Sequence, residues 1–296
     1  MSSRLLVTGA TGLVGPSVVE RLLADGHEVI CIGRSPAKIE HENHLFVQAD
    51  LSQNCAEVLG GLEDIVAIAH MAAHIGGGSP EEDAAAFQSV NIDLTRHLLD
   101  FARERKVRRF IHMSTFAFLA RPLQLPITEG HPTSADEGYA HSKLVAEQMV
   151  CAAATGGLST VALRIPSPLP PRFAALGPNV VRHWIASAAA GQSLKVFGDG
   201  GRRQDFLATS DVAAAVSAAL SKAEPGVYNI ASGQPLSMGQ LARQIAEHFH
   251  VEIVFEGVEG APERWDIDIS KATRELGFEP RVAPRDAIAA LLGSAT

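Results

Sequence analysis

The chain has 296 residues, 46% of them hydrophobic and 20% charged, which is enough for a large core or for one domain with a smaller partner. A net charge of −8 and a pI near 5.8 argue against a general nucleic-acid binder. The three cysteines, Cys31, Cys55 and Cys151, are widely spaced and form no CxxC pair, which favours a reduced protein. The first apolar run ends at Gly9, and no later one reaches the roughly 20 residues of a membrane span. We therefore expect a cytoplasmic protein without a membrane or nucleic-acid partner.

Short β-rich runs alternate with helical patterns through the first half of the chain. The predicted strands are Arg4–Thr8, Glu28–Ile32, His44–Gln48, Ile65–Ala69, Arg108–Met113 and Thr160–Arg164. The predicted helices are Ser17–Ala24, Ala84–Lys106 and Ser142–Thr155. This alternation predicts an α/β protein with a Rossmann-type, doubly wound parallel sheet that is covered by helices on both faces.

The pattern changes after Arg164. The segment Ile165–Pro171 holds four prolines, so it forms neither a regular helix nor a central strand. Shorter elements follow: helices over Val180–Ala190, from Asp211 and near Ser237–Phe249, and a strand over Val227–Ile230. We expect a Rossmann domain over residues 1–164 and a smaller substrate-binding lobe over 165–296, with segments within about 205–232 returning to the main domain.

A glycine-rich turn joins the first predicted strand to the first predicted helix. It reads Gly9-Ala10-Thr11-Gly12-Leu13-Val14-Gly15, a GxxGxxG spacing. Glycines there let backbone N–H groups approach a pyrophosphate, whose charge the helix N-terminus favours. Three glycines alone also fit a plain tight turn, but the strand-to-helix position favours a dinucleotide site.

The second strand gives a weak indication of which dinucleotide binds. No carboxylate stands at its end to bind the ribose 2′-hydroxyl of NAD, and Arg34 could pair with the 2′-phosphate of NADP. We therefore expect NAD(P), with NADP slightly favoured, although Arg34 also fits a solvated loop residue. Asp50, followed by Leu51, stands where adenine would be contacted, but aspartate is equally common at helix caps and turns.

Tyr139 and Lys143 are four residues apart at the start of a helical pattern, so both project from one face. A nearby ammonium and an oxidised nicotinamide would favour the phenolate of a tyrosine whose ordinary pKa, near 10, makes it a poor base. A hydroxyl that orients the substrate oxygen should end a neighbouring strand, and Ser114 and Thr115 stand there. A single YxxxK match is common, and strand-end hydroxyls often only bond the backbone. The occurrence of this pair and of the strand-end hydroxyls together with the glycine turn nevertheless favours a catalytic role.

These motifs, in this order, resemble the extended short-chain dehydrogenase/reductases of the NAD-dependent epimerase/dehydratase type. The resemblance spans nearly the whole chain. It rests on the glycine turn, on Tyr139 and Lys143, and on these further segments: His70–Ala73, Val90–Thr95, Phe197–Gly200, Tyr228–Gly233 and Leu276–Pro280.

The resemblance implies roles for individual residues. Tyr139 and Lys143 match the catalytic pair, Thr115 aligns with the catalytic Ser/Thr with Ser114 as the alternate, and Asn91 matches an asparagine that supports the active site. The expected cofactor-binding residues, besides Tyr139 and Lys143, are Gly9, Thr11, Gly12, Leu13, Val14, Gly15, Arg34, Asp50, Leu51, Met71, Ala72, Ala73 and Ile165. The expected substrate-binding residues are His74, Thr115, Phe116, Arg202, Arg203 and Arg264.

The three arginines are expected at a diphosphate because guanidinium groups donate paired hydrogen bonds to it, although solvent exposure explains them about equally well. The resemblance also implies a homodimer built from the helices around Ala84–Lys106 and Ser142–Thr155. None of the twelve histidines stands in an HExxH motif, so we expect no catalytic metal.

The residues after Thr115 narrow the reaction. The dehydratases and decarboxylating members of the family carry an acidic residue there, whereas this chain has Phe116-Ala117-Phe118. We expect hydride transfer at a secondary alcohol or ketone, with a nucleotide-sugar as substrate in a reaction similar to that of a 4-epimerase. An NADPH-dependent carbonyl reductase or dehydrogenase of a non-nucleotide substrate is the alternative. A non-catalytic dinucleotide-sensing regulator is disfavoured by the retained Tyr139 and Lys143.

Overall fold

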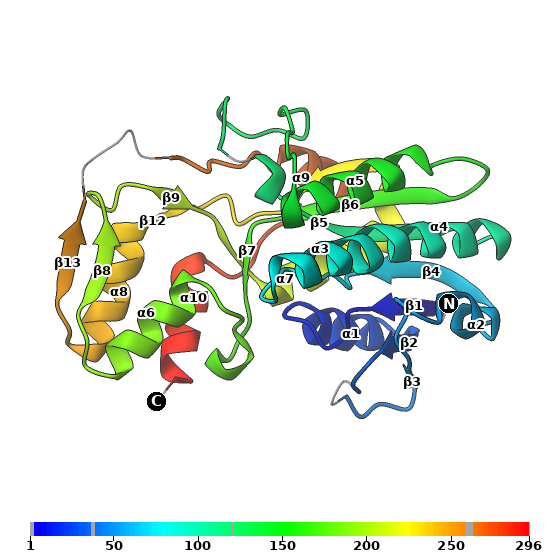
Figure 1. Cartoon of the computed structure of the whole chain (residues 1–296), viewed down its shortest axis with the longest axis horizontal. Helices are drawn as coiled ribbons and strands as arrows, with labels where there is room; N and C mark the ends of the chain where they lie inside the picture. Colours follow the sequence, from blue (N-terminus) through cyan, green and yellow to red (C-terminus); the bar gives the residue numbers. More distant parts are fainter. Residues whose placement is uncertain (1–2, 37–38, 120, 258–262, 296) are drawn as a thin grey trace.

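The computed structural model describes residues 3–36, 39–119, 121–257 and 263–295. Its centre is a seven-stranded parallel sheet in the order β11-β6-β5-β4-β1-β2-β3 (Figure 1). The strands are β1 (Arg4–Thr8), β2 (Glu28–Gly33), β3 (His44–Gln48), β4 (Ile65–His70), β5 (Arg109–Thr115), β6 (Ser159–Ile165) and β11 (Gly226–Asn229). The predicted Rossmann-type fold is thereby confirmed.

Helices cover both faces of this sheet because its strands are apolar on both sides. Leu6, Ile68 and Phe110 face one layer, which is formed by α2 (Cys55–Gly60), α4 (Leu94–Glu104) and α5 (Gly138–Ala152). Leu5, Val7 and Ile111 face the other, formed by α1 (Gly15–Ala24), α7 (Thr209–Lys222) and α9 (Ser270–Leu276). Neighbouring residues of one strand therefore face different helix layers.

The expected single helix over Ala84–Lys106 is divided. It consists of α3 (Pro80–Ala86), a π-helical segment η1 (Phe87–Asp93) and α4. Ser79 begins α3 through a capping box with Glu82. The π-helical segment carries the buried Asn91, and such segments are frequent at functional sites.

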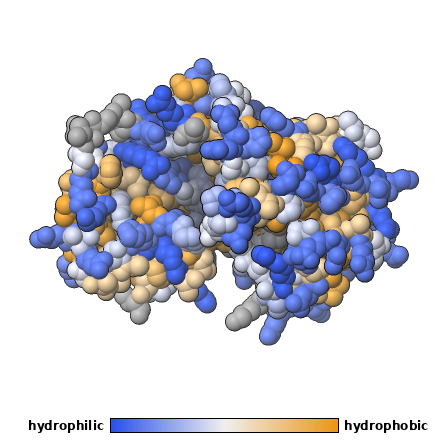
Figure 2. Space-filling view, viewed as in Figure 1, coloured by the Kyte–Doolittle hydropathy of each residue, from blue (hydrophilic) through white to orange (hydrophobic). Residues whose placement is uncertain are grey.

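A smaller lobe with its own hydrophobic core lies beside the sheet, at the left of Figure 1. Its helices are α6 (Val180–Ala189), α8 (Met238–Phe249) and α10 (Pro284–Gly293), and β8 (Leu194–Phe197) pairs in parallel with β13 (Ile253–Glu256). Short ladders join the lobes: β7 (Ser167–Leu169) with β10 (Phe206–Ala208), and β9 (Arg203–Gln204) with β12 (Leu236–Ser237). The 3-10 turns are η2 (Ala117–Leu119) and η3 (Phe173–Ala175). Figure 2 shows the surface hollowed between the two lobes.

Two element boundaries differ from the sequence prediction in ways that affect the site. Strand β5 continues through Ser114 to Thr115, and helix α5 begins at Gly138 rather than at Ser142. Tyr139 therefore lies in the first turn of α5, close to the carboxyl end of β5. Among the residues placed by the structure, no helix is both long and apolar enough to cross a membrane.

Candidate active site

The glycine turn leaves no room for side chains at two of its positions. Gly9 has a φ of +77°, and a Cβ on it would lie 2.5 Å from the backbone nitrogen of Ala72. A Cβ on Gly15 would lie 2.3 Å from the carbonyl oxygen of Gly9. The turn thus forms a bare backbone cradle at the N-terminus of α1, which fits the pyrophosphate of a dinucleotide. Thr11 and Gly12 are exposed, Leu13 is half-buried and Val14 is buried.

The segment after β4 lies against this cradle. The backbone nitrogen of Met71 donates to the carbonyl of Thr8, and that of Ala72 donates to the Thr8 hydroxyl at 3.3 Å. Met71 and Ala72 therefore lie beside Gly9.

The residues expected at the adenosine end lie at the ends of β2 and β3. Arg34 is exposed, and its carbonyl accepts a hydrogen bond from the Gln48 side chain. Asp50 Oδ1 accepts from the Ser52 hydroxyl at 2.7 Å and from its backbone at 3.0 Å, and these bonds lower the pKa of the Asp50 carboxyl. Asp50 thus forms a turn, which was one of its two predicted roles, while Leu51 is buried in the core.

Tyr139 and Thr115 meet where α5 begins and β5 ends. Burial raises the pKa of Tyr139, and a hydrogen bond with the Thr115 side chain opposes that shift. The Tyr139 ring also lies 6.4 Å from the ring of Phe87 in the π-helical segment. The phenol thus lies close enough to Thr115 for that side chain to influence its pKa.

Ser114 points to the opposite side of β5 and has a different partner. Its buried hydroxyl donates to Glu147 Oε2 at 2.6 Å. The same carboxylate accepts from Nε and Nη2 of Arg164, at distances down to 2.6 Å, and both charged side chains are buried. The Arg164 guanidinium also lies 5.1 Å from the centre of the Phe118 ring. This network joins α5 to β5 and β6, and it engages Ser114 away from Tyr139.

Lys143 is buried one turn after Tyr139. Its Nζ lies 3.0 Å from Nε2 of His112 on β5. Burial lowers the pKa of Lys143 to about 7, although the charge of Glu147 opposes this shift. Burial likewise holds the pKa of His112 well below its usual range, and the charge of Lys143 adds to that effect.

Asn91 ties the cofactor segment to the catalytic helix. Its Oδ1 accepts from the His74 backbone at 2.8 Å, and its Nδ2 donates to the His74 carbonyl and to the Ser142 hydroxyl. Ser142 in turn donates to the carbonyl of Tyr139 at 2.8 Å. The His74 ring bonds Asp83 at 2.7 Å and lies beside Phe87, so His74 shapes the wall near Tyr139.

A cavity of about 200 Å³ opens beside Thr115, between the two lobes. Residues of both lobes line the cavity, among them Phe116, Ile165, Arg202, Asp205 and Trp265. Ile165, which was expected at the cofactor, thus also lines this cavity. Asp205 accepts hydrogen bonds from the backbone and hydroxyl of Ser232, and burial raises its pKa to about 6.

Of the three arginines expected at a diphosphate, only Arg202 is among the lining residues of this cavity. Arg202 lies 3.5 Å from Glu263. Arg203 and Arg264 both contact Asp266, at 3.6 and 2.5 Å. An anionic substrate group would therefore compete with these carboxylates for the guanidinium groups.

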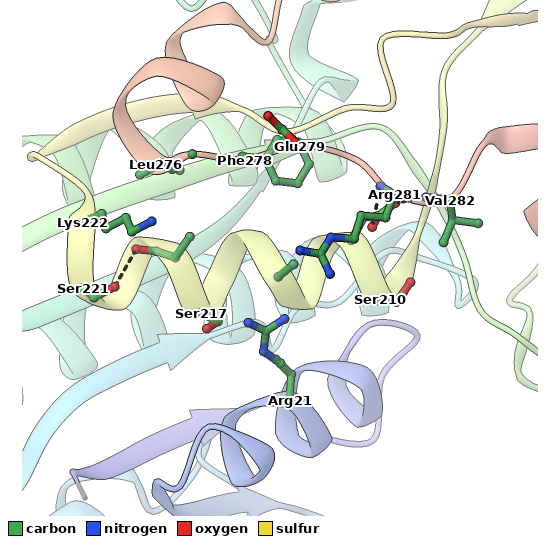
Figure 3. A pocket seen from close by; sticks show the side chains of 14 residues that line it. Arg21, Ser210, Ser217, Ser221, Lys222, Leu276, Phe278, Glu279, Arg281 and Val282 are labelled. Carbon is green, nitrogen blue, oxygen red and sulfur yellow. Dashed lines mark hydrogen bonds between the residues drawn. The ribbon is translucent and has the colours of Figure 1, made fainter. Parts of the chain in front are cut away.

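A larger hollow of about 550 Å³ lies elsewhere, along α7 (Figure 3). Figure 3 shows Arg21 of α1 on one side of α7 and Arg281 on the other, with Lys222 near the end of the helix. None of the predicted site residues lines it. Four of the predicted site residues, Thr115, Phe116, Ile165 and Arg202, line the smaller cavity instead.

Sequence reasoning missed three residues of this region: His112, Glu147 and Trp265. Glu147 follows Lys143 by four residues, so helical spacing could have placed Glu147 on the same helix face as Lys143. His112 and Ser114 alternate with Ile111 and Met113, so strand spacing could have placed both toward the helix layer. Nothing in the sequence signals that Trp265 lines the cavity, because the other lining residues are remote from it in the chain.

The comparison with known families decides the assignment. Residues 5–231 match the model of the family described as "NAD dependent epimerase/dehydratase family". The chain belongs to the NAD dependent epimerase/dehydratase family. This confirms the family that the sequence motifs resemble, and with it an NAD-dependent enzyme of the short-chain dehydrogenase/reductase type.

Relatives of this family match almost end to end. The UDP-glucose 4-epimerase of Mycolicibacterium smegmatis is 29% identical, over 97% of this chain and 96% of its own. The UDP-glucose 4-epimerase of Thermotoga maritima, solved with UDP-glucose, superposes with a TM-score of 0.85 at 26% identity and 98% coverage of both chains. The dTDP-glucose 4,6-dehydratase of Streptomyces venezuelae, solved with NAD and TYD, gives a TM-score of 0.84 at 25% identity, over 98% of this chain and 96% of its own. Among the described residues, no group of His, Cys, Asp or Glu could hold a metal ion.

Proposed function

We propose that this chain is a nucleotide-sugar epimerase that uses NAD(P) and acts at a secondary alcohol of the sugar. The observation that carries the proposal is the meeting of Tyr139 with Thr115 beside the cavity, with Lys143 buried one turn further along α5. The relatives support the substrate class, since the Thermotoga maritima epimerase was solved with UDP-glucose.

The residues divide the work as follows. The Thr115 hydroxyl orients the sugar oxygen toward Tyr139, whose phenol oxygen takes the proton and later returns it. The Lys143 ammonium favours the phenolate, and Arg202 binds the diphosphate at the mouth of the cavity. Gly9, Gly15 and Ala72 form the backbone cradle that would hold the dinucleotide, which when bound accepts hydride from the substrate and gives it back.

The cavity favours epimerisation over dehydration. Asp205 is the one carboxylate among its lining residues, and Ser232 occupies both of its oxygens. Phe116, directly after Thr115, is buried and apolar. No free carboxylate among the described lining residues stands ready to remove a carbon-bound proton, so the chemistry left is hydride transfer.

The proposal is tested by incubating the purified protein with UDP-glucose and following the sugar by proton NMR. We expect interconversion with the 4-epimer, without net consumption of added NAD(P), and oxidised dinucleotide released when the protein is denatured. A 4-keto-6-deoxy product would contradict the proposal, and so would the absence of turnover over a panel of UDP- and dTDP-sugars.

The alternative function is an NADPH-dependent carbonyl reductase, and it rests on Arg34. If Arg34 binds a 2′-phosphate, Arg34→Ala should raise the Kd for NADPH by about tenfold while the Kd for NADH changes little. Calorimetric titration with both dinucleotides measures this difference. Arg21→Ala is the matched control, since Arg21 is also a surface arginine but lies on α1 beside Asp25. Equal losses for the two dinucleotides would remove the reason for expecting NADP.

We further propose that the chain forms a homodimer through α4 and α5 and works in the cytoplasm. The family resemblance supports the dimer, and the widely spaced, unpaired cysteines support the compartment.

A further inference from the structure

The partner of the Lys143 amine is unusual for a buried cation. Lys143 is only 2% exposed, yet its side-chain hydrogen bond goes to a neutral ring, Nε2 of His112, rather than to a carboxylate. The nearest acid on its helix, Glu147, is already bound by Arg164 and Ser114. A buried ammonium without a paired anion is costly, so its acceptor matters.

A second buried imidazole restricts what His112 can do. The His70 ring lies 5.4 Å from the His112 ring and is held between two hydroxyls. Thr95 donates its proton to the Asn91 carbonyl, so it accepts from His70 Nε2 at 2.9 Å. The Thr8 hydroxyl then donates to His70 Nδ1 at 2.7 Å. Burial lowers the pKa of His70 to about 3, so this ring stays neutral and cannot take the proton of its neighbours.

His112 therefore has a single polar contact. Its Nδ1 is buried without a hydrogen-bond partner, so only Nε2 interacts, and it faces the Lys143 amine. Two nitrogens 3.0 Å apart hold one hydrogen between them, because two protonated groups at that distance would repel strongly. While Lys143 is an ammonium, Nε2 must be the acceptor.

We propose that His112 is a positioning residue, that its Nε2 accepts a hydrogen bond from the Lys143 ammonium and holds it in place, and that the two side chains together carry a single positive charge. The inference rests on the proposed function in one respect, the catalytic role of Lys143. The other charged or titratable groups near the pair are His70 on β4, Tyr139 and Glu147 on α5, and Arg164 on β6. Of these, His70 is fixed as neutral, while Glu147 and Arg164 neutralise each other.

This arrangement has a consequence for pH. Burial lowers the pKa of Lys143 from 10.5 to about 7. The pair of Lys143 and His112 is therefore positively charged below that pH and neutral above it. Removing the His112 acceptor destabilises the Lys143 ammonium and lowers the pKa of Lys143 further. The phenolate of Tyr139 then loses its neighbouring positive charge at a lower pH than in the wild type.

The experiment follows the Lys143 proton directly, with neither substrate nor cofactor. The chain has six lysines, so the ¹³Cε signals of labelled lysine can be resolved, and Lys143→Met assigns the relevant one. His112→Phe should lower the Lys143 midpoint by about one pH unit or more. His112→Gln, whose amide oxygen can replace Nε2, should keep the midpoint close to that of the wild type, whereas His112→Asn, which places its oxygen nearer to Nδ1, should behave like His112→Phe.

Activity gives a second readout. His112→Phe and His112→Asn should lower kcat by about tenfold with little change in KM, and His112→Gln should restore it. His27→Phe is the control, since His27 also has an unpartnered buried ring nitrogen but lies before β2, remote from the site. A Lys143 midpoint that is the same in His112→Phe as in the wild type would overturn the proposal.

A measurement on the wild type covers the case in which His112→Phe does not fold. The ¹⁵N signals of His112 should show hydrogen on Nδ1 and none on Nε2 below the Lys143 midpoint, and should change at that midpoint. Hydrogen on Nε2 at pH 6 would contradict the proposal. Because this titration needs no sugar, its failure is distinguishable from the absence of epimerase activity.

Discussion

Tyr139→Phe should lower kcat by about 10²- to 10⁴-fold, the range that general acid–base catalysis contributes. The substitution removes the phenol oxygen that Thr115 influences, while the phenyl ring fills the same space beside Phe87. The cradle at Gly9 and Gly15 is untouched, so the Kd for the dinucleotide should change by no more than about threefold. Steady-state kinetics and calorimetric titration measure the two quantities.

The chain provides a matched control, because its second tyrosine, Tyr228, lies outside the site. Its hydroxyl bonds the Glu224 carbonyl and the Glu275 carboxylate, each at 3.0 Å. Tyr228→Phe should cost about 1 kcal/mol of stability and leave kcat unchanged. Wild-type kcat in Tyr139→Phe, or an equal loss in both variants, would contradict the role given to Tyr139.

Arg164→Met should cost about 3–5 kcal/mol of the free energy of unfolding, because it leaves the buried Glu147 carboxylate without its counter-ion. Both side chains of the pair are about 95% buried, and the Arg164 guanidinium also packs on Phe118. Denaturant unfolding at neutral pH measures the loss. The double variant Arg164→Met/Glu147→Leu should recover most of it, since no charge then remains unpaired.

The control for this prediction is an ion pair on the surface. Lys195 and Glu256 are 2.9 Å apart but mostly exposed, so Lys195→Met should cost less than about 1 kcal/mol. If the double variant proves as unstable as Arg164→Met, the cost comes from lost packing rather than from the unpaired carboxylate.

Much of the sheet could be predicted because the inner strands β1, β2 and β4 are continuous apolar runs that are buried between neighbouring strands. β1 and β3 have the predicted bounds, and β2 and β4 are one residue longer than predicted. The π-helical turn could not be predicted, because the hydrogen bonds of Asn91 with His74 and Ser142 come from distant segments. The strands β8 and β13 were missed for a similar reason: each is four residues long and pairs only with the other.

The parts of the candidate site that depend only on spacing within one helix or strand could be predicted. Helical spacing placed Tyr139 and Lys143 on one face, and the strand end provided Thr115. The partners of these residues depend on packing between layers. That Ser114 bonds Glu147 and that Lys143 meets His112 follow from the alternation of β5, which turns His112 and Ser114 toward α5 and which the sequence prediction did not use.

The route of the chain between the two lobes constrains how the protein can be divided. After β6 the chain enters the smaller lobe, returns for α7 and β11, leaves for α8, returns for α9 and leaves again for α10. A truncation at residue 164 would strip the central sheet of β11, its edge strand, and of α7, which packs on α1. Neither half should therefore fold when expressed alone, and a single proteolytic cut in a connecting segment should leave the two pieces associated.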